Sequence, residues 1–271
     1  MLETLRTLFD VYRAQFRATV ALQLQYRVSL VIWLIWSVLE PVVFLTVWST
    51  VAGSTGGRVG NWEPRDFAAY YLIGMWVTHV TFTWIMHEFE FRIRQGQFSP
   101  KLLRPVHPIH ADIADNLTYK LLTAPVLALA TAVLVLTYQP RLEPPTWAVV
   151  AFVPALLLAF WLRFMSGWTL ALAAFWLTRV AAVNELFFLA TIFLSGAWVP
   201  ISLLPGPLQA LSWALPFRWW YAFPVELLMG RLGPDDALVG FGMQLFWALA
   251  VFAIWRLTWA RAVRQYTAVG A

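Results

Sequence analysis

The chain has 271 residues, of which 61% are hydrophobic and only 12% are charged, and its mean hydropathy is +0.67. A soluble domain carries about 25% charged residues, so this composition excludes an ordinary soluble protein and predicts an integral membrane protein that forms a single domain. The chain contains no cysteine, which excludes disulfides, thiolate metal sites and cysteine nucleophiles. The net charge of +5 would fit nucleic-acid binding, but the positions of the basic residues offer another explanation.

Residues 4–22 are predicted to form an amphipathic helix and not a membrane span. Phe9 and Phe16 lie on one face at helical spacing, while Arg13 and Arg17 recur on another face. A basic amphipathic helix of this kind lies in the headgroup region of a membrane. Membrane lipids are therefore its expected partner.

Six apolar stretches are predicted to cross the membrane, which requires about 20 helical residues per crossing. They cover 28–51, 67–86, 113–138, 147–177, 182–197 and 237–259. The fourth stretch is longer than one straight crossing needs and contains Pro154 and Arg163. We therefore expect this span to be tilted or kinked.

The apolar segment 198–235 does not fit a continuous spanning helix. Five prolines interrupt it, at Pro200, Pro205, Pro207, Pro216 and Pro224. Proline removes a helical hydrogen bond and clashes with the preceding turn, so no long helix survives that many breaks. Short re-entrant helices near 207–215 and 224–229 fit better, because irregular backbone at membrane depth must be enclosed by protein or face a wet cavity.

Six spans would place both termini on the same side of the membrane. Thirteen of the 19 Lys and Arg residues, Lys120 among them, are assigned to that side, five to the other side, and Arg163 to a span. The positive-inside rule therefore predicts that both termini are cytoplasmic. Topology explains the basic excess, so no nucleic-acid partner is expected.

The longest internal cytoplasmic loop contains a compact basic segment, RIRQGQFSPKLLRPVHP, at residues 92–108. Gly96 is predicted to end the helix that continues from the second span, since glycine readily adopts the left-handed conformation. Ser99 would then cap a new helix with Pro100 at its first position. Pro105 would end that helix after about five residues.

The predicted helix over 99–104 presents Leu102 and Leu103 between Lys101 and Arg104. An exposed pair of leucines on a basic helix favours docking of another protein. The alternative is a loop that lies against anionic lipid headgroups.

Four segments of the chain carry a combined signature. They are FAAYYLIGMWV at 67–77, EFEFRIRQGQFSPKLLRP at 88–105, LALAAFWL at 170–177, and SGAWVPISLLPGPLQALSWALPFRWWYAFPVELLMG at 195–230. In order and spacing they resemble the permease subunit of a bacterial ABC transporter of the class that exports drugs, lipids or glycans, within a six-span branch. The resemblance covers nearly the whole chain.

This resemblance implies a functional assembly of several chains. The N-terminal helix would be a connecting helix, segment 198–235 would form re-entrant extracellular helices, and the loop helix would be the coupling helix that seats in an ATPase. The implied partners are two ABC ATPase subunits, which carry ATP and Mg, and a second permease copy or a sister permease, all in the bacterial inner membrane. The ATPase contact would fall on Arg94, Gly96, Ser99, Pro100, Lys101, Leu102, Leu103, Arg104 and Pro105.

The residues themselves support a separate motor. A phosphate-binding loop requires a Gly-Lys-Ser/Thr sequence whose lysine reaches the terminal phosphates. The two lysines of this chain, Lys101 and Lys120, follow a proline and a tyrosine. We therefore expect that the chain is not an enzyme by itself and binds no cofactor of its own.

Three ionisable residues lie within predicted spans. Glu40 is near the centre of the first span, His79 is in the second and Arg163 is in the fourth. A charge at such a position costs about 2.5–3.5 kcal/mol on insertion scales, so a role in a substrate pathway is a fair hypothesis. Glu40 and Arg163 would pair across the bundle or across a permease dimer. The alternatives are a purely structural ion pair and an Arg163 that reaches the membrane boundary.

Glu226 lies in the re-entrant segment beside Arg218 and the aromatic residues Trp219 and Trp220. It is predicted to belong to the substrate pathway and to gate its outer exit. The tryptophans themselves are interpreted as interfacial anchors, because amphipathic rings prefer the membrane–water boundary.

An intramembrane enzyme that acts on lipid or peptide substrates is the alternative function. The serine-protease form would need a Gly-x-Ser motif, but phenylalanine stands two residues before both Ser166 and Ser195. The pair His107 and His110 has weak metal-binding spacing without carboxylate support, and both are interpreted as solvated loop residues. Co-purification with an ATPase would distinguish a permease from an enzyme.

Overall fold

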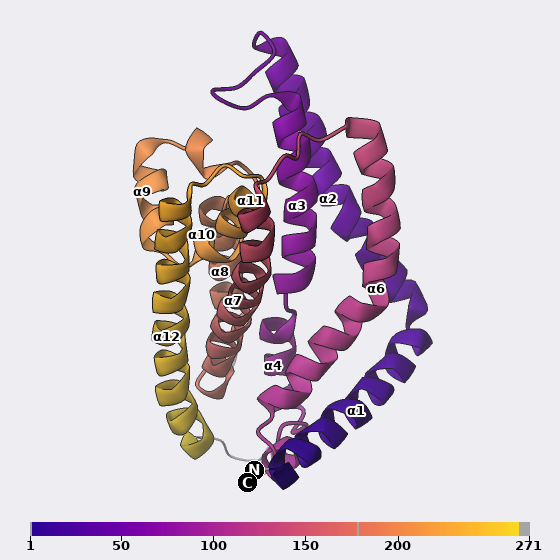
Figure 1. Ribbon diagram of the computed structural model, residues 1–271. Coiled ribbons are helices and arrows are strands. Elements are labelled where there is room, and N and C mark those ends of the chain that lie inside the picture. The colour runs from indigo at the N-terminus through magenta and orange to yellow at the C-terminus, as the bar shows by residue number, and fades with distance from the viewer. Residues whose placement is uncertain (1, 178, 266–271) are drawn as a thin grey trace.

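The computed structural model describes residues 2–177 and 179–265, and within these ranges the chain is built from helices joined by short connections (Figure 1). This confirms the predicted all-α class. An isolated bridge between Val59 and Trp62 closes the loop that follows the first long helix.

The helices, in chain order, have the following bounds. They are α1 (Leu2–Gln25), α2 (Arg27–Ser54), α3 (Pro64–Thr81), α4 (Ile85–Arg94), α5 (Ser99–Leu102), α6 (Ile109–Tyr138), α7 (Thr146–Ala171), η1 (Leu172–Phe175), α8 (Ala181–Ser195), η2 (Ile201–Leu203), α9 (Gly206–Ala214), α10 (Phe217–Trp220), α11 (Ala222–Leu228) and α12 (Pro234–Gln265).

Four helical segments in the described part of the chain are long and apolar enough to cross a membrane. They are α2, α6, α7 with η1, and α12. Helix α8 is equally apolar but has only 15 residues. The protein is therefore a multi-pass membrane protein, while the second and fifth of the six expected spans stay predictions.

The second predicted span, 67–86, is wrong as a single continuous helix. Helix α3 ends at Thr81, Phe82 adopts an extended conformation with φ −64° and ψ 141°, and α4 begins at Ile85. The side chains of Lys120 and Asn116 on α6 donate hydrogen bonds to the carbonyl oxygen of Phe82, so the break is supported from outside the helix.

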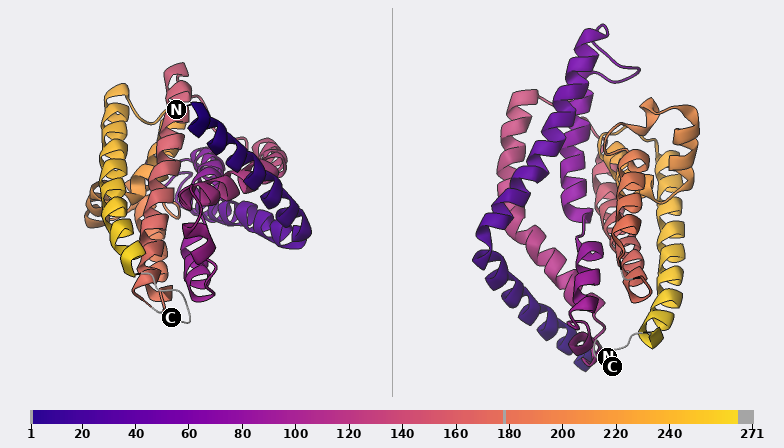
Figure 2. Two further views of the ribbon diagram at one scale, coloured as in Figure 1. Left: turned by 90° about the horizontal axis from the view of Figure 1, so that it is seen from below. Right: turned by 180° about the vertical axis from the view of Figure 1, so that it is seen from behind.

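The start of α1, the loop with α5 and the end of α12 lie at one end of the molecule, the lower end in Figure 1. Helix α1 runs obliquely to the long helices and lies beside α6 in both Figure 1 and Figure 2. Tyr12, Gln15 and Thr19 of α1 bond to His110 and Asp115 of α6. Burial raises the pKa of the Tyr12 hydroxyl.

In the basic loop the turn at Gly96 is confirmed, whereas the predicted cap at Ser99 and the predicted helix over 99–104 are wrong in position and length. Gly96 has a φ of 67°, which is the left-handed conformation that ends the α4 segment. Helix α5 has four residues and begins at Ser99, so Pro100 is its second residue and the capping position falls on Phe98. Phe98 is fully buried and packs against Trp259 of α12.

The proline-rich segment forms the short helices α9, α10 and α11 at the opposite end of the molecule (Figure 1). Trp219 and Trp220 are 1% and 0% exposed. Their interpretation as interfacial anchors is therefore wrong, because the short helices enclose both rings in the protein core.

Candidate functional site

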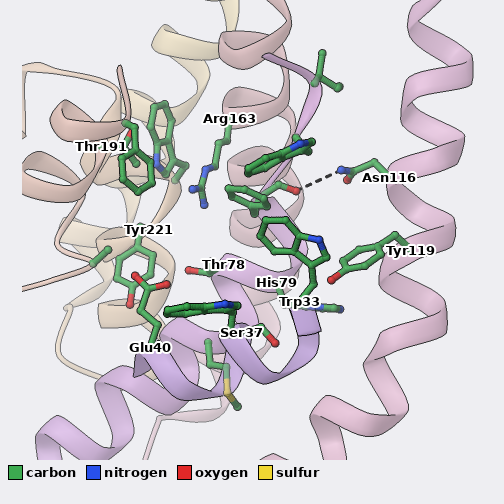
Figure 3. A pocket seen from close by; sticks show the side chains of 18 of the residues that line it. Trp33, Ser37, Glu40, Thr78, His79, Asn116, Tyr119, Arg163, Thr191 and Tyr221 are labelled. Atoms are coloured by element: carbon green, nitrogen blue, oxygen red, sulfur yellow. Dashed lines mark hydrogen bonds between the residues drawn. The ribbon is translucent and has the colours of Figure 1, made fainter. Parts of the chain in front are cut away.

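A pocket of about 450 Å³ lies between α2, α3 with α4, α6 and α8 (Figure 3). Aromatic side chains supply much of its wall, among them Trp33, Trp36, Phe44, Tyr71, Phe82, Trp84, Tyr119 and Tyr221. Polar groups interrupt this wall at a few places. This combination of an apolar lining with few polar groups is typical of small-molecule sites.

Glu40 and Arg163 both line the pocket. Figure 3 shows their side chains pointing into the same space from α2 and α7, with Tyr221 next to Glu40. Among the described residues, the ion pairs closer than 4.0 Å do not include this couple. Glu40 and Arg163 therefore line the same pocket, but they form no ion pair in this structure.

Arg163 has its own partners in the pocket wall. Its Nη1 donates a hydrogen bond to Oγ1 of Thr81 at 2.9 Å, and its guanidinium lies over the ring of Phe82 at 5.4 Å. Both partners are at the end of α3. Arg163 of α7, which lines the pocket, is therefore in direct contact with the break between α3 and α4.

His79 also lines the pocket and is 8% exposed. Its Nε2 lies 3.3 Å from the carbonyl oxygen of Lys120, which accepts hydrogen bonds only, so the ring donates there. The ring stands near those of Trp76 and Tyr119. His79 therefore contributes to the contact of α3 with α6 as well as to the wall.

Lys120 is the residue that sequence reasoning misplaced. It was assigned to the cytoplasmic side, yet it is 7% exposed and lies within α6. Its Nζ donates to the carbonyl of Phe82 at 3.1 Å and contacts Oδ1 of Asn116. Its position inside a predicted span, at 113–138, was the signal that could have identified it.

The pocket extends to a charged cluster formed by the second half of α4 and the start of α6. Asp112 is 2% exposed and accepts hydrogen bonds from Nη1 of Arg92 at 2.6 Å and Nε1 of Trp168 at 3.0 Å, and Nζ of Lys101 lies at 3.5 Å. Burial alone would lower the pKa of Arg92, but the carboxylates of Asp112 and Glu88 raise it. No motif in the sequence indicates this cluster.

The loop helix exposes less apolar surface than its Leu-Leu pair predicts. Leu103 is 87% exposed, whereas Leu102 is partly buried and packs against the core. Lys101 turns toward Asp112, while Arg94, Pro100, Arg104 and Pro105 are exposed. The expectation of two exposed leucines is wrong for Leu102, because this side chain helps to hold the short helix on the protein.

Glu226 does not line the pocket and has a partner elsewhere. Its Oε2 accepts a hydrogen bond from Nη2 of Arg218 at 2.6 Å, and the two side chains are 10% and 5% exposed. The guanidinium of Arg218 also stacks over Trp213 at 4.1 Å. Glu226 thus lies in a closed ion pair within segment 198–235.

Long apolar helices arranged around a pocket with charged walls define a multi-pass membrane protein of the transport class. Residues 34–270 match the model of a family described as ABC-2 family transporter protein. The chain therefore belongs to this family and is a permease subunit of an ABC transporter. No curated protein and no solved structure matches the chain.

Proposed function

We propose that this permease subunit exports an amphipathic molecule through the pocket between α2, α3, α6 and α8 by alternating access. The observation that carries the proposal is the pair of unjoined charges, Glu40 and Arg163, that face an aromatic-walled pocket within long apolar helices. Charges at membrane depth are expensive and lie where a pathway or partner uses them. Aromatic walls would accept the apolar part of the cargo and the two charges its polar part.

The motor would be a separate chain. Two ABC ATPase subunits would bind ATP with Mg and dock on the cytoplasmic surface around α5. Leu103 is 87% exposed and stands next to the exposed Arg104, which supports this contact because both an apolar and a basic side chain are free for a partner. The chain would act with a second copy or a sister permease.

The proposed location is the bacterial inner membrane with both termini in the cytoplasm. The start of α1, the α5 loop and the end of α12 lie at the same end of the molecule, which supports this orientation (Figure 1). Removal of Lys120 from the cytoplasmic count leaves twelve basic residues on that side against five, so the positive-inside argument still holds.

The alternative of an intramembrane enzyme receives no support from the two serines. Oγ of Ser166 donates to the carbonyl oxygen of Leu162, and Oγ of Ser195 accepts from the amide of Ala197. Both hydroxyls are therefore engaged with nearby backbone, whereas a nucleophile needs a neighbouring base.

Co-purification tests the proposal. The tagged chain, extracted from bacterial membranes, should bring down an ATPase whose ATP hydrolysis rises when both are placed in lipid vesicles. Leu103→Asp should reduce association by at least about tenfold, because the loss of an interface hot spot costs about 2 kcal/mol or more. Leu142→Asp is the matched control, since this leucine is also exposed but lies in the connection between α6 and α7.

The control variant should retain the ATPase. Absence of any ATPase with the unaltered chain, or equal retention by the Leu103 variant, would refute the proposed docking surface. A turnover of lipid or peptide by the isolated chain would favour the enzyme instead.

A further inference from the structure

Helix α6 carries a polar face in an otherwise apolar sequence. Asp112, Asn116 and Lys120 recur every four residues and so lie on one side of the helix. Asp112 and Lys120 are buried and Asn116 is half-buried. Buried polar groups need partners, and these partners come from different elements at the two ends of the face.

The lower end of this face holds the loop helix. Asp112 bonds to Arg92 of α4 and Trp168 of α7, and it lies 3.5 Å from Nζ of Lys101 on α5. The short charge-assisted bond from Arg92 joins α4 to α6, and the longer contact of Lys101 brings α5 to the same carboxylate.

The upper end of the face holds the break between α3 and α4. Lys120 and Asn116 donate to the carbonyl of Phe82 at 3.1 Å and 3.3 Å. The residue before the break, Thr81, accepts the hydrogen bond of Arg163 in the pocket wall. A displacement of α6 along its axis would therefore act on the break and on the position of Arg163.

The two ends are connected by uninterrupted helix. Residues 112–120 lie within α6, whose internal proline comes later at Pro125. Eight residues of α helix span about 12 Å and behave as a stiff rod. A short non-helical joint such as 82–84, by contrast, can absorb changes in φ and ψ, which is how hinges work.

We propose that the polar face of α6, from Asp112 to Lys120, is the link through which the loop helix α5 operates a hinge at residues 82–84 and thereby moves Arg163 in the pocket. The inference rests on the proposed function, because an ATPase must move α5. Asp112, Asn116 and Lys120 are positioning residues in this scheme; Asp112 and Asn116 also line the pocket, whereas Lys120 does not.

The hinge offers a direct optical readout. The chain has no cysteine, so Trp84→Cys gives a single thiol in the hinge for a bimane label. The ring centroid of Trp33 on α2 is 5.0 Å from that of Trp84. Trp33 would therefore quench the label by contact, and an opening of the hinge would raise the fluorescence.

The experiment uses the labelled permease with its co-purified ATPase in vesicles of phosphatidylethanolamine and phosphatidylglycerol. Addition of ATP with vanadate should change the fluorescence of the labelled parent. Asp112→Asn and Lys120→Met should reduce that change by about fivefold or more, which is the usual range of allosteric coupling. ATPase association and basal ATP hydrolysis should persist in Lys120→Met, because Leu103 remains exposed and Lys120 is not part of the pocket wall.

Two further variants serve as controls. Arg141→Met removes one member of an ion pair with Glu63, 3.6 Å apart and in connections outside the network, and it should leave the change intact. Lys120→Arg retains a cationic donor and should restore at least part of the response. A merely structural role of Lys120 or Asp112 would lower assembly and hydrolysis together with the fluorescence change.

The outcomes separate the two proposals. A parent that brings down no ATPase would overturn the proposed function and this link with it. A parent that responds to ATP while the Asp112→Asn and Lys120→Met complexes respond equally would overturn the link alone. Should Lys120→Met not assemble, the near-isosteric Asp112→Asn decides by the same criterion.

Discussion

Two places in this protein bring an arginine and a glutamate together at depth, and they differ in how the charges are used. In the proline-rich segment 198–235, Arg218 and Glu226 meet at 2.6 Å, with the guanidinium over the ring of Trp213. In the pocket, Glu40 and Arg163 face a shared space without such a contact. The first pair is closed and surrounded by protein, whereas the second is open to whatever occupies the pocket.

The difference separates structural from functional charge. A buried pair repays its desolvation only through close contact and further hydrogen bonds, so removal of one partner leaves a costly charge behind. An open pair contributes little to stability while the pocket is empty, and its charges remain available to bind a ligand. The same substitution should therefore lower stability strongly in the closed pair and hardly at all in the open pair.

The largest expected effect is on the closed pair. Glu226→Gln should lower the stability by about 3 kcal/mol, because Arg218 would keep its charge without a counter-ion. The measurement is the thermal midpoint of the purified protein in detergent. Glu40→Gln, the matched change in the open pair, should shift stability by no more than about 0.5 kcal/mol.

A double replacement tests the reason for this loss. Arg218→Met with Glu226→Leu should recover most of the stability, since no charge is then left alone. Equal destabilisation by Glu226→Gln and Glu40→Gln would contradict the distinction between a closed and an open pair.

A second prediction concerns Gly74 and Tyr221, which line the pocket that holds the open pair. A Cβ atom at Gly74 would lie 2.0 Å from the hydroxyl oxygen of Tyr221, so Gly74→Ala forces the tyrosine ring to move. Overpacking of this kind costs about 1–3 kcal/mol, which chemical or thermal unfolding would detect. Gly242→Ala is the control, because a Cβ there meets no atom within 4 Å.

Relief of the clash would show that the close approach is the cause. The double variant Gly74→Ala, Tyr221→Ala should lose less stability than the sum of the two single variants. An additive result would mean that Gly74 matters for another reason, such as backbone flexibility.

A third prediction uses the open pair as a probe of transport. Glu40→Gln should preserve assembly and basal ATP hydrolysis but lower ATP-driven uptake into inverted membrane vesicles by about tenfold. A lost hydrogen bond to a charged group is worth about 1.5–3 kcal/mol, and 1.4 kcal/mol is tenfold. Fluorescent amphipathic dyes of either charge serve as test cargo. Unchanged uptake of every transported dye would exclude Glu40 from the pathway.

The sequence predicted those features that local residue chemistry decides. The all-α class follows from apolar composition, the left-handed turn at Gly96 from glycine, and the short helices α9 and α11 from the spacing of prolines. Each depends on the residue itself or its near neighbours. Such features need no knowledge of tertiary contacts.

The features that were missed depend on distant partners. The break at 82–84 contains neither glycine nor proline, and it is supported by Lys120 and Asn116 from another helix. Lys120 was predicted to be cytoplasmic because the sequence does not show the carbonyl of Phe82 to which its charged group donates. Trp219 likewise appeared amphipathic in sequence, but the surrounding short helices enclose it.

The sequence could predict that Glu40 and Arg163 share one pocket, because both lie deep in separate spans and charges inside a bundle tend to face its interior. It could not predict that the two charges stay apart, because this depends on the hydrogen bond that holds the guanidinium at Thr81. The cluster around Asp112 lay beyond sequence reasoning for the same cause. It draws its members from α4, α5, α6 and α7.

The smallest expected effect comes from His107, which was interpreted as a solvated loop residue and is instead packed near Trp168, Trp255 and Trp259. Burial, with a smaller contribution from the neighbouring His110, lowers the pKa of His107 from 6.5 to about 4, although Asp112 opposes this shift. The unfolded chain therefore binds a proton between these values that the folded protein does not. The contribution of the neutral, packed His107 to the free energy of unfolding is therefore fully present above about pH 6.5 and is lost as the pH falls toward 4.

The variant His107→Asn tests this pH dependence, because its amide oxygen can replace Nδ1 as the acceptor for the amide of Ile109. Its thermal midpoint should fall less between pH 7 and pH 5 than that of the unaltered protein. An identical fall in both proteins would show that His107 is not shielded from water by the packed tryptophans around it.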